Sequence, residues 1–308
     1  MKLVITIPAF NEEKTIAKVI EEIPKKIAGI DKIEIIVVDD GSTDKTAQIA
    51  KRLNAIVVRH ACNRGLAKAF KTGLDAALEC GADIIVNTDA DFQYNQKQVP
   101  LLIKPILEGK ADIVLGSRFK GHIEEMPASK RWGNILATKI VNFVAGCKVS
   151  DAQTGFRAFS REAALRMNIS SDFTYTQESL LIASEYNLKI AEVPVDFRKR
   201  ADSSRLFSSI WGYAKRAGMT LLIAYLNYHP LKFFLSLGGL LVLGGLLAGS
   251  RVLARFLETG AIEPFMPTAL LSSLLLILGL EVIMIGLVAE IVKFDRKTNE
   301  EILYRLKK

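Results

Sequence analysis

Short apolar runs rich in β-branched residues recur over the first two thirds of the chain, and polar residues bound each of them. Runs of this length and composition predict buried β-strands. They occur at Leu3–Ile7, Ile33–Val38, Ala55–Val58, Ile84–Val86 and Ile113–Leu115, with another at Glu192–Phe197.

Apolar residues return at helical spacing in several of the segments between these runs. We expect helices at Lys14–Ile27, Lys45–Leu53, Ala67–Glu79 and Gln98–Glu108. An alternation of strands and helices predicts a mostly parallel sheet with helices on both of its faces. The fold class is therefore α/β, with a Rossmann-like sheet.

The pattern changes beyond residue 230, where two long apolar blocks replace the short runs. A helix needs about 20 mostly apolar residues to cross a bilayer. Residues 231–250 and 266–291 meet this requirement, and Arg251–Phe265 is expected to be the loop that connects them. The sequence thus predicts a two-helix membrane hairpin that follows a larger soluble domain.

The segment before the hairpin mixes aromatic residues with Lys215 and Arg216. This mixture is typical of amphipathic helices at a membrane interface, although an ordinary surface helix has the same pattern. We therefore divide the chain into a soluble domain at 1–206, interfacial helices at 207–230, the hairpin at 231–292 and a basic tail at 293–308.

Basic residues flank both apolar blocks, in a chain of 308 residues with a net charge of +8. Their placement favours contact with lipid head groups and argues against a nucleic-acid partner. The connecting loop balances its two basic residues with Glu258 and Glu263, so the positive-inside rule predicts that the soluble domain and both termini are cytoplasmic. Three scattered cysteines without C-x-x-C spacing indicate neither a disulfide framework nor a zinc site.

Glu281 falls inside the second apolar block, where an ionisable side chain is costly. Two interpretations remain open. The glutamate is either neutral or hydrogen-bonded at a helix interface, or it takes part in handling a lipid phosphate or in contacts between copies of the chain.

Polar motifs follow three of the expected strands, at their carboxyl ends. They are Pro8–Glu12, Asp39–Ser42 and Asp89–Asp91. Ligands bind at this edge of a parallel sheet, so we expect the three motifs to converge there. Asp89 and Asp91, with Gln93 nearby, are suited to hold one Mg²⁺ or Mn²⁺ that also binds a diphosphate. A D-x-D sequence alone is weak evidence, but its position after an apolar run strengthens it.

Together these motifs resemble the inverting family-2 glycosyltransferases of the GT-A fold. Three further motifs narrow the resemblance to dolichyl-phosphate mannose synthases and their bacterial polyprenyl-phosphate glucosyltransferase relatives. These motifs are Gly116–Phe119, Gly155–Arg157 and the run that ends in Ser204–Leu206. The resemblance covers roughly residues 1–230, with the motifs in family order, and the membrane hairpin matches the bacterial relatives.

The resemblance implies a transfer of a hexose from a nucleotide-sugar to a polyprenyl phosphate, either dolichyl or undecaprenyl. It assigns catalytic roles to Asp89, Asp91 and Arg118. The implied nucleotide-sugar site consists of Pro8, Phe10, Glu12, Val37, Asp39, Asp89, Ala90, Asp91, Arg118, Arg200 and Arg205. The implied lipid-phosphate site consists of Arg118, Arg131, Asn134, Asp151 and Arg200.

Arginine forks suit phosphate oxygens, although Arg131 is equally well explained as a surface charge. Asp151 and Glu178 are candidate acids or bases, and Asp151 is better explained as a positioning residue in the acceptor loop. A phosphate acceptor is largely a dianion at neutral pH, so the reaction needs no strong base.

The sequence also departs from the family pattern. Phe10 stands where many relatives have tyrosine, Asp202 where they usually have glycine, and Arg205 replaces a common lysine. These differences leave the donor open. GDP-mannose is our first expectation, and UDP-glucose or UDP-N-acetylglucosamine is the alternative.

Three other functions compete with this interpretation. A processive polysaccharide synthase would carry Q-x-x-R-W, but Ala128 stands in place of the glutamine before Arg131-Trp132. A non-catalytic scaffold is disfavoured because Asp89 and Asp91 are both present. A tethered transferase that acts on a soluble acceptor is disfavoured by the basic interfacial segment.

Overall fold

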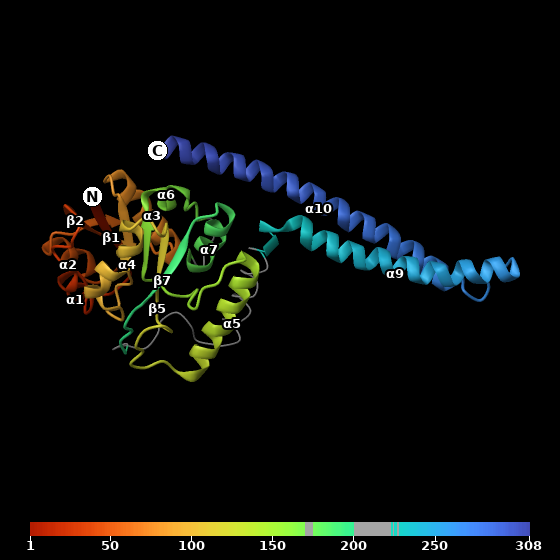
Figure 1. Ribbon diagram of the computed structural model, residues 1–308, viewed down its shortest axis with the longest axis horizontal. Coiled ribbons are helices and arrows are strands. Elements are labelled where there is room, and N and C mark those ends of the chain that lie inside the picture. The colour runs from red at the N-terminus through yellow and green to blue at the C-terminus, as the bar shows by residue number, and fades with distance from the viewer. Residues whose placement is uncertain (170–174, 200–222, 224, 227) are drawn as a thin grey trace. The chain divides into compact units, whose positions relative to one another are not determined.

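The computed structural model describes residues 1–169, 175–199, 223, 225–226 and 228–308, except for the side chains of residues 129 and 130. The chain divides into two compact units. The first comprises Met1–Leu221 with Lys307–Lys308, and the second comprises Leu222–Leu306. Both appear in Figure 1.

A seven-stranded sheet forms the centre of the first unit, in the order β3-β2-β1-β4-β6-β5-β7. Its strands are β1 (Lys2–Ala9), β2 (Lys32–Asp39), β3 (Ile56–Arg59), β4 (Ile84–Asn87), β5 (Ile113–Ser117), β6 (Arg157–Ser160) and β7 (Ile190–Pro194). Among these strands β6 alone runs antiparallel to its neighbours, β4 and β5. The expected mostly parallel sheet is confirmed, and β6 is an addition to it.

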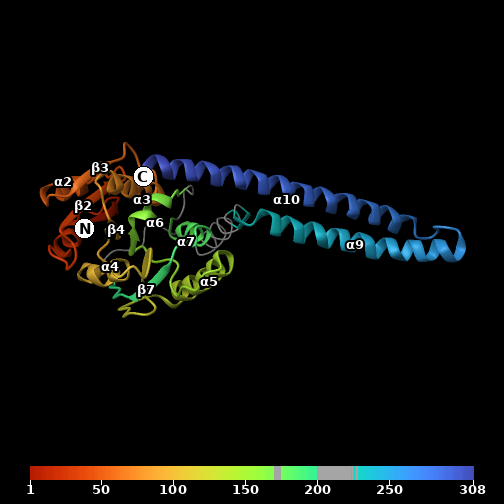
Figure 2. The same cartoon turned by 45° about the horizontal axis from the view of Figure 1, so that its top comes forward.

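Helices cover both faces of this sheet (Figure 2). On one face α1 (Ile16–Glu22), α2 (Thr46–Arg52) and α4 (Val99–Leu107) share a core with alternate residues of β1. On the other face lie α3 (Leu66–Glu79), α6 (Arg161–Arg166) and α7 (Tyr175–Glu185). There the ring of Phe70 on α3 stacks on Tyr175 of α7 at 3.8 Å between centroids. A short 3₁₀ helix, η1 (Gln96–Gln98), precedes α4, and α5 (Ala128–Ala145) packs against α7.

The first helix is shorter than the sequence pattern suggests. It ends at Glu22, and Ile23 already has an extended ψ of 126°. Pro24 follows Ile23, and a residue before proline is disfavoured in the helical region. The apolar residue Ile27 therefore joins the core from irregular backbone rather than from the helix.

The second unit contains two long antiparallel helices, α9 (Pro230–Thr259) and α10 (Met266–Lys307). The expectation of a loop over Arg251–Phe265 is wrong for residues 251–259, which are helical. Good helix formers continue up to Thr259, and the helix ends where Gly260 adopts a left-handed φ of 68°. The basic tail is likewise helical up to Lys307, with an ion pair between Arg305 and Glu301 one turn apart.

Close contacts between small residues join α9 to α10. A Cβ added at Gly238 would lie 2.7 Å from the carbonyl oxygen of Gly279, and one added at Gly286 would lie 2.7 Å from Phe234 Cβ. Ser272 Oγ donates a hydrogen bond of 2.7 Å to the carbonyl of Gly245. Small residues and interhelical hydrogen bonds of this kind let membrane helices pack closely.

Within the described residues, α9 and α10 are the helices that are long and apolar enough to cross a membrane. Their apolar windows have mean hydropathies of 2.0 and 2.5, and only 11% of each window is buried. This exposure favours membrane association over a soluble core helix. Glu281 is exposed on α10, whereas Gly279 and Ile283 are the neighbours that contact α9. Its side chain therefore lies outside the α9–α10 interface.

Candidate active site

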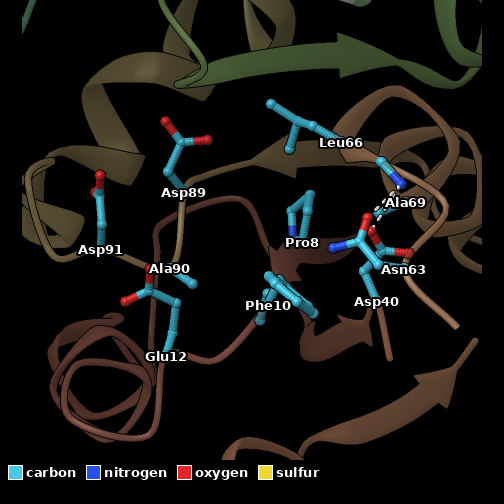
Figure 3. A pocket seen from close by; sticks show the side chains of 12 residues that line it. Pro8, Phe10, Glu12, Asp40, Asn63, Leu66, Ala69, Asp89, Ala90 and Asp91 are labelled. Atoms are coloured by element: carbon cyan, nitrogen blue, oxygen red, sulfur yellow. Dashed lines mark hydrogen bonds between the residues drawn. The ribbon is translucent and has the colours of Figure 1, made fainter. Parts of the chain in front are cut away.

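A pocket of about 270 Å³ opens at the carboxyl ends of β1 and β4. Figure 3 shows Asp89, Asp91 and Glu12 on one side of Phe10, with Asp40 and Asn63 on the other. The lining residues are Pro8, Ala9, Phe10, Glu12, Asp40, Asn63, Gly65, Leu66, Ala69, Asp89, Ala90 and Asp91. The expected convergence of the polar motifs at one sheet edge is thus seen in the structure.

The loop after β1 is fastened to the loop after β2. Asn11 has a left-handed φ of 54°, its backbone N–H donates to Ser42 Oγ, and its side chain accepts from the N–H of Thr43. This turn directs Phe10 into the pocket (Figure 3). The aromatic face at position 10 is therefore available for stacking on a planar ligand.

Two adjacent aspartates at the end of β2 have different roles. Asp39 is fully buried, accepts from the N–H of Ser42 at 3.0 Å and lies 3.0 Å from Arg59 Nε. Neither Asp39 nor Val37 lines the pocket, although both were predicted for the nucleotide-sugar site. Asp40, which the sequence analysis did not select, lines it instead.

Asp40 holds the opposite wall of the pocket. Its carboxylate accepts from the backbone N–H groups of Arg64 and Gly65, each at 2.9 Å, and lies 2.7 Å from His60 Nδ1. His60 Nε2 in turn is 3.0 Å from Thr72 Oγ1 on α3. These bonds position the pocket residues at the start of α3. In the sequence, the feature that could have indicated this role was the second carboxylate of the Asp39-Asp40 pair.

The loop after β4 carries the two carboxylates proposed for a metal. Asp89 and Asp91 are half-buried, and both line the pocket. Asp91 Oδ1 accepts from the N–H of Gln93 at 3.2 Å, and Phe92 between them has a left-handed φ of 61°. This compact turn places Asp89 and Asp91 along the same rim (Figure 3).

Gln93 does not line the pocket. Its amide Nε2 donates to the carbonyl of Arg198 at 3.2 Å, and the N–H of Arg198 donates back to the carbonyl of Gln93 at 2.8 Å. The guanidinium of Arg198 lies over the ring of Phe92 at 4.4 Å and pairs with Glu22 at 2.7 Å. Gln93 therefore anchors the loop to the chain after β7.

Asp89 lies directly against Gly155. A Cβ added at Gly155 would be 2.7 Å from each carboxylate oxygen of Asp89. Gly155 is fixed by three hydrogen bonds: its N–H donates to Tyr94 Oη at 3.0 Å, and its carbonyl accepts from Asn87 Nδ2 at 2.9 Å and from Tyr175 Oη at 3.4 Å. Burial raises the pKa of Tyr94 to about 12, so this hydroxyl stays protonated at neutral pH.

The charge of the pocket suits a cation. Four carboxylates line it, and its lining contains no lysine or arginine among the residues that the structure describes. Asp40 is held by His60 and two backbone N–H groups, whereas Asp89 and Asp91 lie along the rim on the other side of Phe10 (Figure 3). Mg²⁺ in proteins is commonly bound by one or two carboxylates together with substrate phosphates. The donor set therefore fits one divalent cation that a diphosphate helps to coordinate.

Arg118 and Asp151 form a buried bidentate pair. Arg118 Nε donates to Asp151 Oδ2 at 2.7 Å, and Nη2 donates to Oδ1 at 2.8 Å. Both side chains are at least 94% buried. The fork proposed to bind phosphate is thus bonded to Asp151, another residue of the proposed lipid-phosphate site.

The loop that carries Asp151 is held from several sides. Glu192 accepts from the N–H of Ser150 at 2.7 Å, and Thr138 Oγ1 on α5 accepts from the N–H of Ala152 at 3.1 Å. Arg157 is fully buried and donates to the carbonyls of Ala152 and Thr154. Burial lowers the pKa of Arg157 to about 10, so it remains charged at neutral pH.

The remaining predicted residues lie elsewhere. Arg131 is exposed and Asn134 is buried, both on α5, and neither lines the pocket. Arg200 and Arg205 lie outside the described residues. The sequence analysis missed Asn63, Gly65, Leu66 and Ala69, which precede or begin α3. The sequence feature that could have identified these pocket residues is the polar stretch between β3 and α3, which contains an Asn-x-Gly sequence.

Comparison with known proteins agrees with this geometry. Residues 4–166 match glycosyl transferase family 2. The chain is 40% identical over 199 residues to an uncharacterised protein of Methanocaldococcus jannaschii, covering 63% of this chain and 80% of that protein. It is 35% identical over 211 residues to the UDP-N-acetylglucosamine–dolichyl-phosphate N-acetylglucosaminyltransferase of Methanococcus voltae, covering 61% of this chain and 82% of the relative.

A solved structure with a similar fold is glucosyl-3-phosphoglycerate synthase from Mycobacterium tuberculosis, in complex with Mn²⁺, UDP-glucose and phosphoglyceric acid. The match has a TM-score of 0.56 and 26% identity, and it covers 73% of this chain and 79% of the other. The sheet, the pocket and these matches define a GT-A glycosyltransferase. The chain belongs to glycosyl transferase family 2.

Proposed function

We propose that the protein transfers a hexose from a nucleotide-sugar to the phosphate of a polyprenyl lipid, with inversion at the anomeric carbon. The observation that carries this proposal is the carboxylate rim of Asp89 and Asp91, in the pocket that Phe10 lines. The relative from Methanococcus voltae, named for transfer to dolichyl phosphate, supports the acceptor. The apolar helices α9 and α10 support a lipid substrate.

In this proposal Phe10 stacks on the base, and Asp89 and Asp91 hold the cation that binds the donor diphosphate. When bound, a divalent cation stabilises the negative charge that develops on the departing nucleoside diphosphate. Asp40 contributes by holding the loop that forms the opposite wall of the pocket. The neighbouring structure solved with Mn²⁺ and UDP-glucose supports the use of a divalent cation by this fold.

The acceptor phosphate is the nucleophile. One of its oxygens forms a bond to the anomeric carbon while the bond from that carbon to the donor phosphate breaks. No general base is required, because a phosphate monoester is largely a dianion at neutral pH. The chain must instead offset the repulsion between two anionic substrates. We assign this task to Arg200 and Arg205, which follow Arg198 in the sequence, because the fork of Arg118 is bonded to Asp151.

The same proposal sets the orientation of the chain in the membrane. Helices α9 and α10 cross the bilayer as a hairpin, and both termini and the catalytic domain are cytoplasmic. The support is the excess of basic residues outside the apolar blocks and the balanced charge of residues 251–265. Residues 207–230, expected at the cytoplasmic interface, lie for the most part outside the described residues.

GDP-mannose is the first candidate donor, from the resemblance to dolichyl-phosphate mannose synthases. A UDP-linked N-acetylhexosamine is the second, and it is favoured by the 35% identity to the enzyme of Methanococcus voltae. The test uses purified full-length protein, Mg²⁺ or Mn²⁺, radiolabelled GDP-mannose, UDP-glucose or UDP-N-acetylglucosamine, and either a polyprenyl phosphate or phosphoglyceric acid as the acceptor. An organic-soluble product with one donor supports the proposal. Label that stays water-soluble with all donors, or that passes to phosphoglyceric acid instead, contradicts it.

A further inference from the structure

Arg198, in the chain after β7, contacts both residues that directly follow Asp91. Its guanidinium lies over the ring of Phe92, 4.4 Å from the ring centroid. Its backbone N–H donates to the carbonyl of Gln93 at 2.8 Å, and its carbonyl accepts from the side-chain amide of Gln93 at 3.2 Å. The loop that carries the two rim carboxylates is therefore held by a residue from a distant part of the sequence.

Glu22, the last residue of α1, holds the guanidinium of Arg198 in place. Its carboxylate accepts from Arg198 Nη1 at 2.9 Å and from Nη2 at 2.7 Å, so the pair is bidentate. The N–H of Gln96 donates a further hydrogen bond of 3.0 Å to the same carboxylate. A bidentate pair fixes the orientation of a guanidinium as well as its position. We call Glu22, Arg198 and Phe92 the rim clamp.

Phe92 has a backbone conformation that needs support. Its φ of 61° lies in the left-handed region, which is uncommon for a residue with a bulky side chain. Such a conformation costs free energy and persists where the surrounding structure determines it, often at a functional site. The ring of Phe92 lies against the guanidinium of Arg198 and packs against the core of the domain. These contacts hold the backbone in a turn that the loop alone would not favour.

The turn at Phe92 sets the position of the Asp91 carboxylate. Asp91 Oδ1 accepts from the N–H of Gln93 at 3.2 Å, and Gln93 is bonded in turn to Arg198. Asp91 lines the pocket together with Asp89. The carboxylates that bind a metal ion are oriented by residues behind them, and changes in those residues weaken metal binding. A shift of Arg198 would therefore reach the rim through two short connections.

We propose that Glu22 and Arg198 are positioning residues for the divalent cation that Asp89 and Asp91 bind. Neither residue lines the pocket, so both act through Phe92 and the residue after it. This inference rests on the proposed function only for the cation site itself. It assigns a role in metal and donor binding to an ion pair that lies outside the pocket.

Another ion pair of the same domain provides a matched control. Lys2 and Glu34 are 2.8 Å apart, with side chains 21% and 19% exposed, compared with 24% and 12% for Arg198 and Glu22. Lys2 begins β1 and Glu34 lies near the start of β2, whereas the pocket opens at the carboxyl ends of the strands. Loss of either pair should affect folding to a similar extent. Only loss of the rim clamp should affect the cation.

The direct test measures Mn²⁺ binding by full-length protein, from the electron paramagnetic resonance signal of free Mn²⁺. Titrations are made with Mn²⁺ alone and with Mn²⁺ plus GDP or UDP. We expect Glu22→Ala and Arg198→Ala to bind Mn²⁺ about tenfold or more weakly, the effect typical of residues that orient metal ligands. Glu34→Ala should stay within about twofold of the unmodified protein, because its pair lies far from the rim.

Two further variants test whether the residues act as one unit. The double variant Glu22→Ala with Arg198→Ala should bind Mn²⁺ little more weakly than either single variant, because each change alone already breaks the clamp. Arg198→Lys should recover only part of the affinity, since an ammonium group neither forms a fork nor lies flat on a ring. Losses that add in the double variant would show that the two residues act separately and would overturn the proposal.

Melting temperatures distinguish positioning from folding. All titrations are made well below the melting temperature of each variant. A lowered melting temperature of Glu22→Ala or Arg198→Ala with unchanged Mn²⁺ binding would assign the pair to stability alone and would overturn the proposal. If the unmodified protein binds no Mn²⁺ with either nucleoside diphosphate, the cation site fails, and this proposal fails with the proposed function. If it binds Mn²⁺ but transfers no sugar to a polyprenyl phosphate, only the proposed function fails, and the variants still decide the role of the clamp.

Discussion

The Cα of Gly155 lies so close to the carboxylate of Asp89 that a methyl group at residue 155 would meet both oxygens at 2.7 Å. Gly155 does not have a left-handed φ, so alanine is tolerated by the backbone. Gly155→Ala should therefore displace Asp89 without unfolding the domain. We expect a loss of about 10- to 100-fold in transfer efficiency, the scale associated with a misplacement of about 1 Å.

The measurement for Gly155→Ala is the dependence of transfer on metal and donor concentration, together with the melting temperature. Gly133→Ala is the control, because an added Cβ there meets nothing within 4 Å. If Asp89 is displaced, Gly155→Ala should need higher concentrations of metal and donor for the same rate of transfer, and its melting temperature should be unchanged. Normal kinetics in Gly155→Ala would show that the position of Asp89 is not critical.

The Arg118–Asp151 pair should be a strong determinant of stability. Asp151→Asn leaves the buried guanidinium without a countercharge, and breaking such a pair costs about 3 to 5 kcal/mol. We expect the melting temperature of the full-length protein to fall by roughly 6 °C or more. Lys120→Ala breaks an ion pair whose lysine is half-exposed and should cost under about 1 kcal/mol. Equal shifts in the two variants would contradict this ranking.

The Glu22–Arg198 pair predicts a pH dependence. Burial opposes the charge of Glu22, but hydrogen bonds from Arg198 and Gln96 outweigh it and lower its pKa from 4.5. A lowered carboxyl pKa contributes stability above the unfolded value, and this contribution is lost as the pH falls through the folded value. Glu22→Gln should therefore be less stable than the unmodified protein at pH 7, and the difference should shrink below about pH 4.5. Thermal melts from pH 3 to pH 7 measure it, and a constant difference would contradict the assignment.

Adjacent glycines on α9 allow a test of the helix pair. A side chain at Gly238 collides with Gly279 and Ile283, whereas one at Gly239 meets nothing within 4 Å. Gly238→Leu should separate the helices and destabilise the protein by about 1 to 3 kcal/mol or more. Gly239→Leu adds the same side chain without the collision. Similar melting temperatures for the two variants in detergent would show that α9 and α10 do not pack through these residues.

The sequence predicted the strands that are buried on both faces, because their apolar runs are continuous. Leu3, Val4 and Ile5 of β1 are all completely buried, which is why their pattern was unambiguous. Strand β6 was missed because it has only four residues and begins with the buried Arg157. Helix α5 was missed because apolar residues occur on both sides of it, so its sequence lacks a clean polar face.

The candidate site was predictable at the level of motifs and less so at the level of individual side chains. Asp89 and Asp91 line the pocket as expected, because a D-x-D after a strand can only lie at the sheet edge. Asp39 and Asp40 are adjacent, and their positions in the sequence do not show which of them faces the pocket. The pairing of Arg118 with Asp151 joins residues 33 apart, and no local pattern indicates it.

The most direct test of the central claim compares Asp91→Asn with the unmodified protein in transfer of radiolabelled sugar to a polyprenyl phosphate. An amide at position 91 keeps the shape of the side chain and removes the charge that holds the metal against the diphosphate. We predict a normal melting temperature and no organic-soluble product, even in saturating Mg²⁺ or Mn²⁺. Near-normal transfer by Asp91→Asn would contradict the account.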